Sequence, residues 1–175
     1  VIHRLPRMMD RAWRLESAEL LQVPAPDLPA LSLATPASRC PHCGHHIRWY
    51  ENVPVLSWLA LRGRCSACKA PISPRYPLVE AATGLLFGLL AWQFGPVPTV
   101  LAWCLFAAVL VALAGIDWDT TLLPDSLTMP LLWAGLVAAA AGWTLPLSTA
   151  LWGAVFGYLS LWSVCALFKL ATGKD

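Results

Sequence analysis

Lysine and arginine are absent from a long part of this chain. None occurs between Tyr76 and Phe168, whereas a soluble domain carries about 25% charged residues spread over its surface. Charge is also scarce overall, because 13% of the residues are charged and 58% are hydrophobic. These scarcities exclude an ordinary soluble domain and place the second part of the chain in a lipid bilayer. The net charge of +2 is accordingly a poor guide to partners, and no nucleic-acid partner is expected.

The part without basic residues divides into apolar segments separated by proline and glycine. A helix needs about 20 apolar residues, within a range of about 17–25, to cross the hydrocarbon core. The segments reach this length, the third one only marginally, and the breaks fall at Gly95–Pro98, at Pro124 and at Pro146. The predicted fold class is an all-α polytopic membrane protein with four transmembrane helices, at about 78–94, 98–116, 127–143 and 148–170.

The basic residues that are present indicate how the helices are oriented. All lie at or before Arg75, or at Lys169 and Lys174. Because short cytoplasmic segments are enriched in lysine and arginine, the segment before the first helix is assigned to the cytoplasm. The two turns expected on the outside, near 95–98 and 144–147, carry no charge. The acidic loop at 117–126 then lies on the cytoplasmic side.

Two regions are predicted along the chain. Residues 1–76 form a basic cytoplasmic segment with a cysteine module at 39–75, and residues 77–175 form the transmembrane domain. Residues 1–19 alternate basic and apolar side chains, as in a short amphipathic helix, and residues 23–36 have the proline-rich composition of an extended linker. The chain does not begin with methionine and stops at what reads as the start of a loop, so it is expected to be a fragment that lacks both termini.

Two Cys-x-x-Cys motifs stand in the first region. Four thiolates supplied as two pairs are the closed tetrahedral donor set of a structural zinc site, and on the reducing side of a membrane such pairs favour a metal over disulfides. His42, His45 and His46 lie close enough in the sequence to replace a thiolate, although four cysteines already complete the shell. Unligated thiols and a redox role are the weaker alternatives. The predicted zinc ligands are Cys40, Cys43, Cys65 and Cys68.

Acidic residues gather where the second apolar segment ends. Asp117, Asp119 and Asp125 follow Ile116 closely, and the simplest interpretation is that solvated loop acids terminate a helix. However, carboxylates that border a membrane segment are costly and are functional candidates by default. Asp117 adjoins the apolar segment directly and is the main candidate, while Asp125 or Ser126 is expected to cap the next helix. Aspartic proteolysis needs two carboxylates that share one proton, so a single one does not suffice.

Taken together, these features resemble the bacterial type IV prepilin peptidases, a family of bifunctional leader peptidases and N-methyltransferases. The resemblance covers essentially the whole chain and rests on long strings rather than on one short motif. The strings are His3-Arg4-Leu5-Pro6, Cys40 to Trp58, Arg62-Gly63-Arg64-Cys65, Arg75 to Glu80, Ile116 to Asp125, Trp152 to Ser163 and Phe168 to Lys174.

The resemblance implies an aspartic peptidase of the bacterial inner membrane. Such enzymes cleave the leader from prepilins and type II secretion pseudopilins on the cytoplasmic side, and then methylate the new N-terminal amine with S-adenosylmethionine. By the same resemblance, Asp117 is the first catalytic aspartate and the four cysteines are the zinc ligands. In the family a Gly-x-Gly-Asp motif with the second aspartate follows the Thr172-Gly173-Lys174 turn, so the 175 residues alone are expected to be inactive. No Gly-rich strand-to-helix turn for the methyl donor is readable.

Two other functions stay open at this point. A membrane-anchored zinc module that acts only as a scaffold would not need Asp117, and a transporter or channel would use the acids as an ion site. The scarcity of polar residues between Pro77 and Ile116 argues against transport. In a peptidase, the Trp49–Asn52 segment is a candidate contact for the prepilin, although ordinary packing of a small zinc module explains it equally well.

Overall fold

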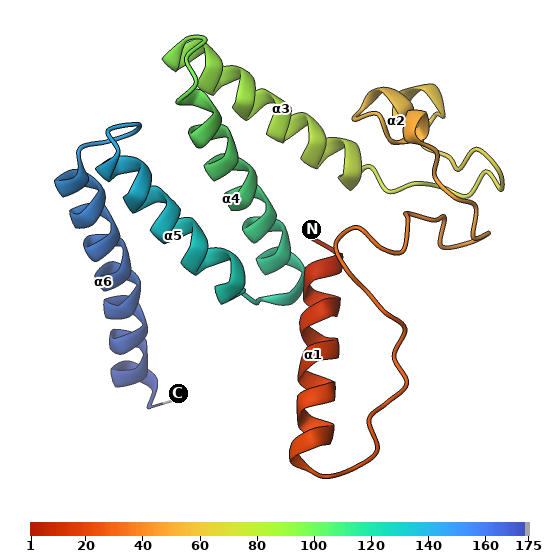
Figure 1. The fold of residues 1–175 in the computed structure, drawn as a ribbon, viewed down its shortest axis with the longest axis horizontal. Coiled ribbons are helices and arrows are strands. Elements are labelled where there is room, and N and C mark those ends of the chain that lie inside the picture. The colour runs from red at the N-terminus through yellow and green to blue at the C-terminus, as the bar shows by residue number, and fades with distance from the viewer. Residues whose placement is uncertain (174–175) are drawn as a thin grey trace. The chain divides into compact units, whose positions relative to one another are not determined.

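The computed structural model describes residues 1–173, and apart from two isolated bridges every regular element in this range is helical. The prediction of an all-α chain is confirmed. In chain order the elements are α1 (Arg4–Leu20), the 3-10 helix η1 (Trp49–Asn52), α2 (Leu56–Ala60), α3 (Arg75–Phe94), α4 (Val100–Thr120), α5 (Asp125–Ala140) and α6 (Leu147–Thr172) (Figure 1).

Three helices within residues 1–173 are long and apolar enough to cross a bilayer. They are α3, α4 and α6, with 20, 21 and 26 residues, and most of their side chains are exposed, as in helices that lipid surrounds. Helix α5 has 16 residues, slightly fewer than the about 17–25 that a span requires. The structure thus has three candidate spans and, at the third predicted segment, which was only marginally long enough, one shorter apolar helix.

The bounds of α5 follow from the residues at its two ends. Pro124, with φ −67° and ψ 122°, is the N-cap, and no side chain caps the helix there. The helix stops after Ala140, and Gly142 adopts φ +73°, a conformation that ends helices. The prediction that Asp125 or Ser126 caps this helix is wrong, because Asp125 already lies in the first turn. Its negative charge there meets the positive end of the helix dipole.

The described chain forms two compact units. One contains residues 1–89 and 110–123, and the other contains residues 90–109 and those from Pro124 onward. In the second unit α5 packs against α6, and Phe94 stacks on Trp103 with ring centroids 5.4 Å apart. Both cysteine motifs and Asp117 belong to the first unit, which therefore positions the candidate site.

In the first unit the proline-rich linker runs back along α1 (Figure 1). The Arg4 guanidinium donates hydrogen bonds to the carbonyl oxygens of Ser32, at 3.2 Å, and Pro36, at 2.7 Å. Further along α1, Arg11 donates to the carbonyl oxygen of Pro29. The predicted amphipathic helix is thus present as α1, and its arginines hold the linker through the linker's own backbone.

Candidate metal centre and acidic site

The first cysteine pair lies in a tight turn closed by an antiparallel bridge between Arg39 and His46. Inside this bridge the N–H of Cys40 donates to the carbonyl oxygen of His45 at 2.9 Å. Gly44 adopts φ +71° and donates its N–H to the carbonyl oxygen of Cys40, also at 2.9 Å. A glycine suits this position because the left-handed region is sterically strained for other residues.

The second cysteine pair repeats this geometry. Another isolated bridge closes this turn. The N–H of Cys65 donates to the carbonyl oxygen of Ala70 at 2.8 Å, and the N–H of Lys69 donates to the carbonyl oxygen of Cys65 at 3.1 Å. Lys69 takes the place of Gly44 and adopts φ +60°. Because a left-handed conformation costs a residue with a side chain roughly 1–2 kcal/mol, the surroundings of this turn impose its shape.

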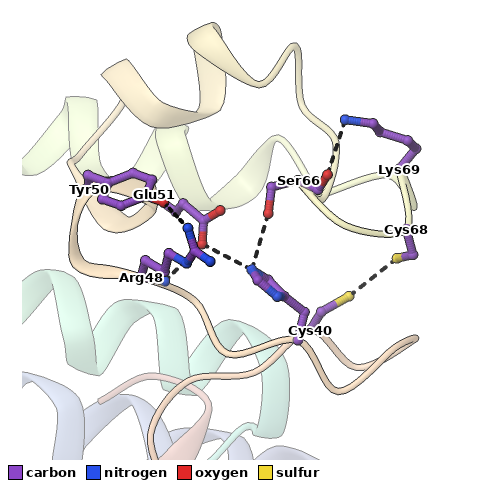
Figure 2. Close-up of polar contacts among 8 residues, drawn as sticks. Cys40, Arg48, Tyr50, Glu51, Ser66, Cys68 and Lys69 are labelled. Carbon is purple, nitrogen blue, oxygen red and sulfur yellow. Dashed lines mark hydrogen bonds and ion pairs between the residues drawn. The ribbon is translucent and has the colours of Figure 1, made fainter.

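The two turns bring four sulfur atoms together. The Sγ atoms of Cys40, Cys43, Cys65 and Cys68 all lie within 4.8 Å of one another, and those of Cys40 and Cys68 are 3.8 Å apart (Figure 2). Sulfurs bound to one zinc ion at about 2.3 Å in tetrahedral geometry lie about 3.8 Å from one another. The arrangement therefore fits a closed structural zinc site built from the four residues singled out in the sequence.

Backbone N–H groups stabilise the thiolate of the first cysteine in each turn. The N–H groups of Cys43 and His42 lower the pKa of Cys40 to about 7. In the second turn, the N–H of Cys68 has the largest effect in lowering the pKa of Cys65. Since the thiolate is the form that binds a metal, the backbone of each turn prepares its first cysteine for ligation.

Cys43 behaves in the opposite way. The N–H of His45 lowers its pKa, but removal from water and hydrogen bonds with the sulfurs of Cys68 and Cys40 outweigh that effect and raise the pKa to about 11. Four thiolates at this spacing repel one another, and a divalent cation removes the repulsion while displacing the remaining protons. The electrostatics of the tetrad thus favour a bound cation.

His45 is engaged away from the sulfurs. Its Nε2 lies 3.3 Å from Oε2 of Glu51 and 3.2 Å from the Ser66 hydroxyl (Figure 2). The same Glu51 oxygen accepts the backbone N–H of Arg48 at 2.8 Å. The Arg48 N–H, the Ser66 hydroxyl and His45 together lower the pKa of Glu51 to about 2, against the opposing effect of burial. These contacts join η1 to both turns and occupy a histidine that sequence spacing allowed as a ligand.

Helix α2 contacts the end of the second turn through Trp58. Its indole N–H donates to the carbonyl oxygen of Ile72 at 3.2 Å. Gly63 lies under the ring with φ +66°, and a Cβ atom built on it would lie 2.8 Å from the nearest ring carbon. Both the backbone angle and the available space therefore require glycine at this position.

The acidic site lies in the last turn of α4, which runs to Thr120. Oδ1 of Asp119 accepts a hydrogen bond from Nη1 of Arg75 at 2.5 Å, and Nη2 of Arg75 donates to the carbonyl oxygen of Gly115 at 3.2 Å. Nδ1 of His3 lies 3.8 Å from the other carboxylate oxygen of Asp119. This Arg75–Asp119–His3 cluster ties the starts of α1 and α3 to the end of α4.

Apolar packing reinforces the cluster. Ile116 is fully buried, at 0% exposure. A Cβ atom at Gly115 would lie 2.7 Å from Cδ1 of Ile2, so the segment before α1 rests directly on the backbone of α4. The last turn of α4 is consequently fixed on two sides, by the cluster and by this contact.

Asp117 differs from Asp119 although both lie in the same helical turn. Its side chain is exposed and makes no hydrogen bond or ion pair within residues 1–173. Its backbone carbonyl oxygen accepts the N–H of Thr121 at 2.8 Å, which closes the helix. Asp119 is paired with the Arg75 guanidinium, whereas the exposed Asp117 carboxylate has no such partner within residues 1–173.

Sequence reasoning did not single out Arg75 or His3 as parts of this site. The signal that points to Arg75 is its place as the last basic residue before a long stretch without any. An ionisable residue at a membrane helix is a functional candidate, but only the structure shows that its partner is Asp119. The role of His3 depends on packing and has no signal in its own sequence neighbourhood.

Two family models match the chain. One is described as the bacterial peptidase A24 N-terminal domain and matches residues 1–94, and the other is described as the type IV leader peptidase family and matches residues 104–174. The chain belongs to this bacterial A24 peptidase family, which confirms the resemblance found in its sequence strings.

Among curated proteins, the chain is similar to several that are called prepilin leader peptidase/N-methyltransferase. It is 57% identical to that of Stutzerimonas stutzeri and 54% identical to that of Pseudomonas aeruginosa, in each case over 176 residues that cover 100% of this chain and 61% of the relative. The identity to the Neisseria gonorrhoeae protein is 47%, covering 99% of this chain and 62% of the relative. The chain thus spans about three fifths of the length of these relatives. No solved structure matches it.

Proposed function

We propose that the whole protein is a prepilin peptidase and N-methyltransferase of the bacterial inner membrane, with its arginine-rich segment, residues 1–76, facing the cytoplasm. The names of the relatives and the type IV leader peptidase model support both activities in general terms. The orientation follows from the enrichment of lysine and arginine in cytoplasmic segments. The observation that carries the peptidase proposal is the end of α4, where Arg75 holds Asp119 while Asp117 has a free carboxylate.

Asp117 supplies one carboxylate of an aspartyl dyad. In such a dyad one carboxylate takes a proton from water as the water attacks the scissile carbonyl, and the other is protonated and donates a hydrogen bond to the carbonyl oxygen. The family resemblance assigns the second aspartate to the Gly-x-Gly-Asp motif that follows the Thr172-Gly173-Lys174 turn in the family. Asp119 and Arg75 position the helical turn that carries Asp117 and do not touch the reacting atoms.

The substrates are prepilins and pseudopilins, in which a basic leader precedes an apolar helix. That helix would lie in the bilayer beside the exposed apolar side chains of the spans. The scissile bond would then reach the cytoplasmic interface, where α4 ends with Asp117. After cleavage the new N-terminal amine attacks the methyl group of S-adenosylmethionine. The new N–C bond forms as the C–S bond breaks, S-adenosylhomocysteine leaves and a proton passes to water.

The four cysteines would hold Zn²⁺ in a structural role. A four-sulfur shell leaves no open position for water or substrate, so the ion would link the two turns and supply no catalytic group. The module that it holds together also carries Glu51, His45 and the start of α2.

The decisive experiment compares Asp117→Asn and Asp119→Asn in the full-length protein, with prepilin cleavage followed in membranes. Loss of a dyad carboxylate removes the proton acceptor, so Asp117→Asn is expected to lower the cleavage rate by about a thousandfold or more. Asp119→Asn keeps Asp117 and is expected to cost far less. Asp10→Asn, on α1, is the matched control and should leave the rate unchanged.

The opposite pattern would remove Asp117 from the mechanism. Full cleavage by Asp117→Asn together with complete loss in Asp119→Asn would transfer the catalytic role to Asp119. Full cleavage by both variants would remove both aspartates from the mechanism, whereas an absence of cleavage by the wild type would favour the zinc scaffold without peptidase activity. The abundance and membrane insertion of each variant must match the wild type for either comparison to count.

A further inference from the structure

A cavity of about 470 Å³ lies in the first unit beside the cysteine tetrad. It is lined by residues of both cysteine turns, η1 and α2, and its volume is within the range of about 300–1,000 Å³ that small-molecule sites occupy. None of the four cysteines lines it. The polar groups in its wall come from His45, Arg48, Tyr50, Glu51, Ser57 and Ser66.

The wall carries two opposite charges at defined positions. The Glu51 side chain is 9% exposed and is held by the Arg48 backbone N–H and by His45 (Figure 2). The Arg48 guanidinium donates from Nη1 to the Tyr50 hydroxyl at 2.6 Å and lies 5.9 Å from the centre of the Tyr50 ring. A carboxylate, a guanidinium and an aromatic ring are therefore presented together on one short segment.

We infer that this cavity binds the methyl donor S-adenosylmethionine, an inference that rests on the proposed N-methyltransferase function. The donor combines an amino-acid zwitterion, a sulfonium cation and an adenine ring. The Glu51 carboxylate suits the ammonium or sulfonium group, and the fork of the Arg48 guanidinium suits the α-carboxylate. The Tyr50 ring offers a surface on which adenine stacks. A cationic group, the α-carboxylate and the adenine ring of the donor thus each have a partner among the residues of the wall.

The geometry favours this small molecule over the prepilin leader. An extended basic peptide needs an open groove with acidic groups along it, whereas this cavity has one carboxylate and one guanidinium near each other. Trp49 lies next to Tyr50 in the chain, but it is 83% exposed and does not line the cavity. The Trp49 ring packs edge-on against Tyr50, with centroids 5.8 Å apart, but lies outside the cavity wall, so Trp49→Leu is a control for the loss of a neighbouring aromatic ring.

The first test uses the wild-type full-length protein and needs no substitution. The protein in detergent is irradiated with methyl-labelled S-adenosylmethionine, and the labelled peptide is identified by mass spectrometry. The label is expected within residues 45–67, which contain the whole cavity lining. Competition by unlabelled S-adenosylhomocysteine should remove the label. A competable label located elsewhere in the protein overturns the inference.

The second test measures equilibrium binding of S-adenosylhomocysteine and the rate of leader cleavage in three variants. Arg48→Gln keeps the backbone N–H that Glu51 accepts, and Tyr50→Leu removes the stacking surface. Each is expected to weaken binding about tenfold or more, with cleavage within about twofold of wild type. Trp49→Leu should bind as the wild type does. Unchanged binding in both cavity variants contradicts the assignment.

The outcomes separate this inference from the proposed function. If the wild type neither cleaves nor methylates a prepilin, the proposed function fails. If the wild type methylates but Arg48→Gln and Tyr50→Leu bind normally, only the cavity assignment fails. If a cavity variant also loses cleavage, its folding is damaged, and the position of the label in the wild-type protein decides.

Discussion

Glu51 connects η1 with both cysteine turns. Its carboxylate accepts a hydrogen bond from the backbone N–H at the start of η1 and pairs with His45 after the first cysteine turn. It also interacts with the Ser66 hydroxyl in the second cysteine turn. These donors stabilise the carboxylate, not the carboxylic acid, and so its pKa falls from 4.5 to about 2. A group with a lowered pKa in the folded state stabilises that state while it is ionised.

The stability contribution of Glu51 is therefore expected to be complete above pH 4.5 and to be lost as the pH falls toward 2. The variant Glu51→Gln should be less stable than the wild type at neutral pH, and the difference should shrink below pH 4.5. Hydrogen exchange of residues 40–70 in the full-length protein measures this. Glu19→Gln, on an exposed position of α1, is the control. A difference that does not change with pH would show that Glu51 acts through packing alone.

At the residue scale the grouping of the four cysteines could be predicted from the sequence because their spacing is local. A Cys-x-x-Cys turn is closed by hydrogen bonds within a few residues, as between Cys40 and Gly44. The engagement of His45 by Glu51 and Ser66 could not be read in the same way. Three histidines stand near the first pair, and only the folded module shows which one is occupied.

At the scale of elements, the last turn of α4 depends on helices that are distant in the sequence. Arg75 begins α3, and its partner Asp119 lies 44 positions later. The guanidinium contacts both the carboxylate and the Gly115 carbonyl oxygen, and therefore sets the helix end in position as well as balancing a charge. No local pattern predicts this pair, because each residue is explained on its own by a helix terminus.

Replacing Arg75 with Gln is expected to lower kcat for leader cleavage by about 10–100-fold with little change in KM, because the turn that carries Asp117 shifts while substrate binding is kept. Arg75→Lys should restore part of the rate, since an ammonium pairs with Asp119 but cannot also reproduce the guanidinium fork. Arg62→Gln, on an exposed loop residue, should behave as the wild type does. Equal effects of Gln and Lys, or a change confined to KM, would contradict a positioning role.

The apolar helices show which element bounds the sequence can and cannot give. The breaks at Pro96, Pro124 and Pro146 were predicted from composition, and they separate α3, α4, α5 and α6 from one another. Their exact ends depend on single residues that extend or stop a helix. Helix α4 continues through the polar residues to Thr120, and α5 stops before Gly142. Hydrophobicity alone places the end of α4 too early in the sequence and the end of α5 too late.

For the molecule as a whole, the cysteine tetrad and the membrane helices are expected to respond differently to metal removal. The cysteine turns have no regular secondary structure apart from two isolated bridges, so the metal supplies much of their stability. The spans satisfy their backbone groups within each helix and need no metal.

Chelation of the full-length protein in detergent is expected to release one zinc ion per chain and to remove hydrogen-exchange protection in residues 40–70. Protection in α3, α4 and α6 should persist. Cys65→Ser should abolish zinc retention as well, whereas Cys104→Ser, outside the tetrad, should retain one ion. Zinc retained by Cys65→Ser, or an absence of zinc from the wild type, would contradict the structural zinc site.

The contacts between α1 and the proline-rich linker determine how far the cysteine module can travel. A free proline-rich linker over residues 23–36 would be a semi-rigid, extended spacer of about 3.1 Å per residue, with its ends up to roughly 40 Å apart. The Arg4 and Arg11 guanidinium groups hold its carbonyl oxygens, and these contacts restrict the distance between the linker ends. The start of the module is then confined near α1, which raises its effective concentration there. Because these contacts join arginines to neutral carbonyl groups, salt should weaken this confinement much less than it weakens exposed ion pairs.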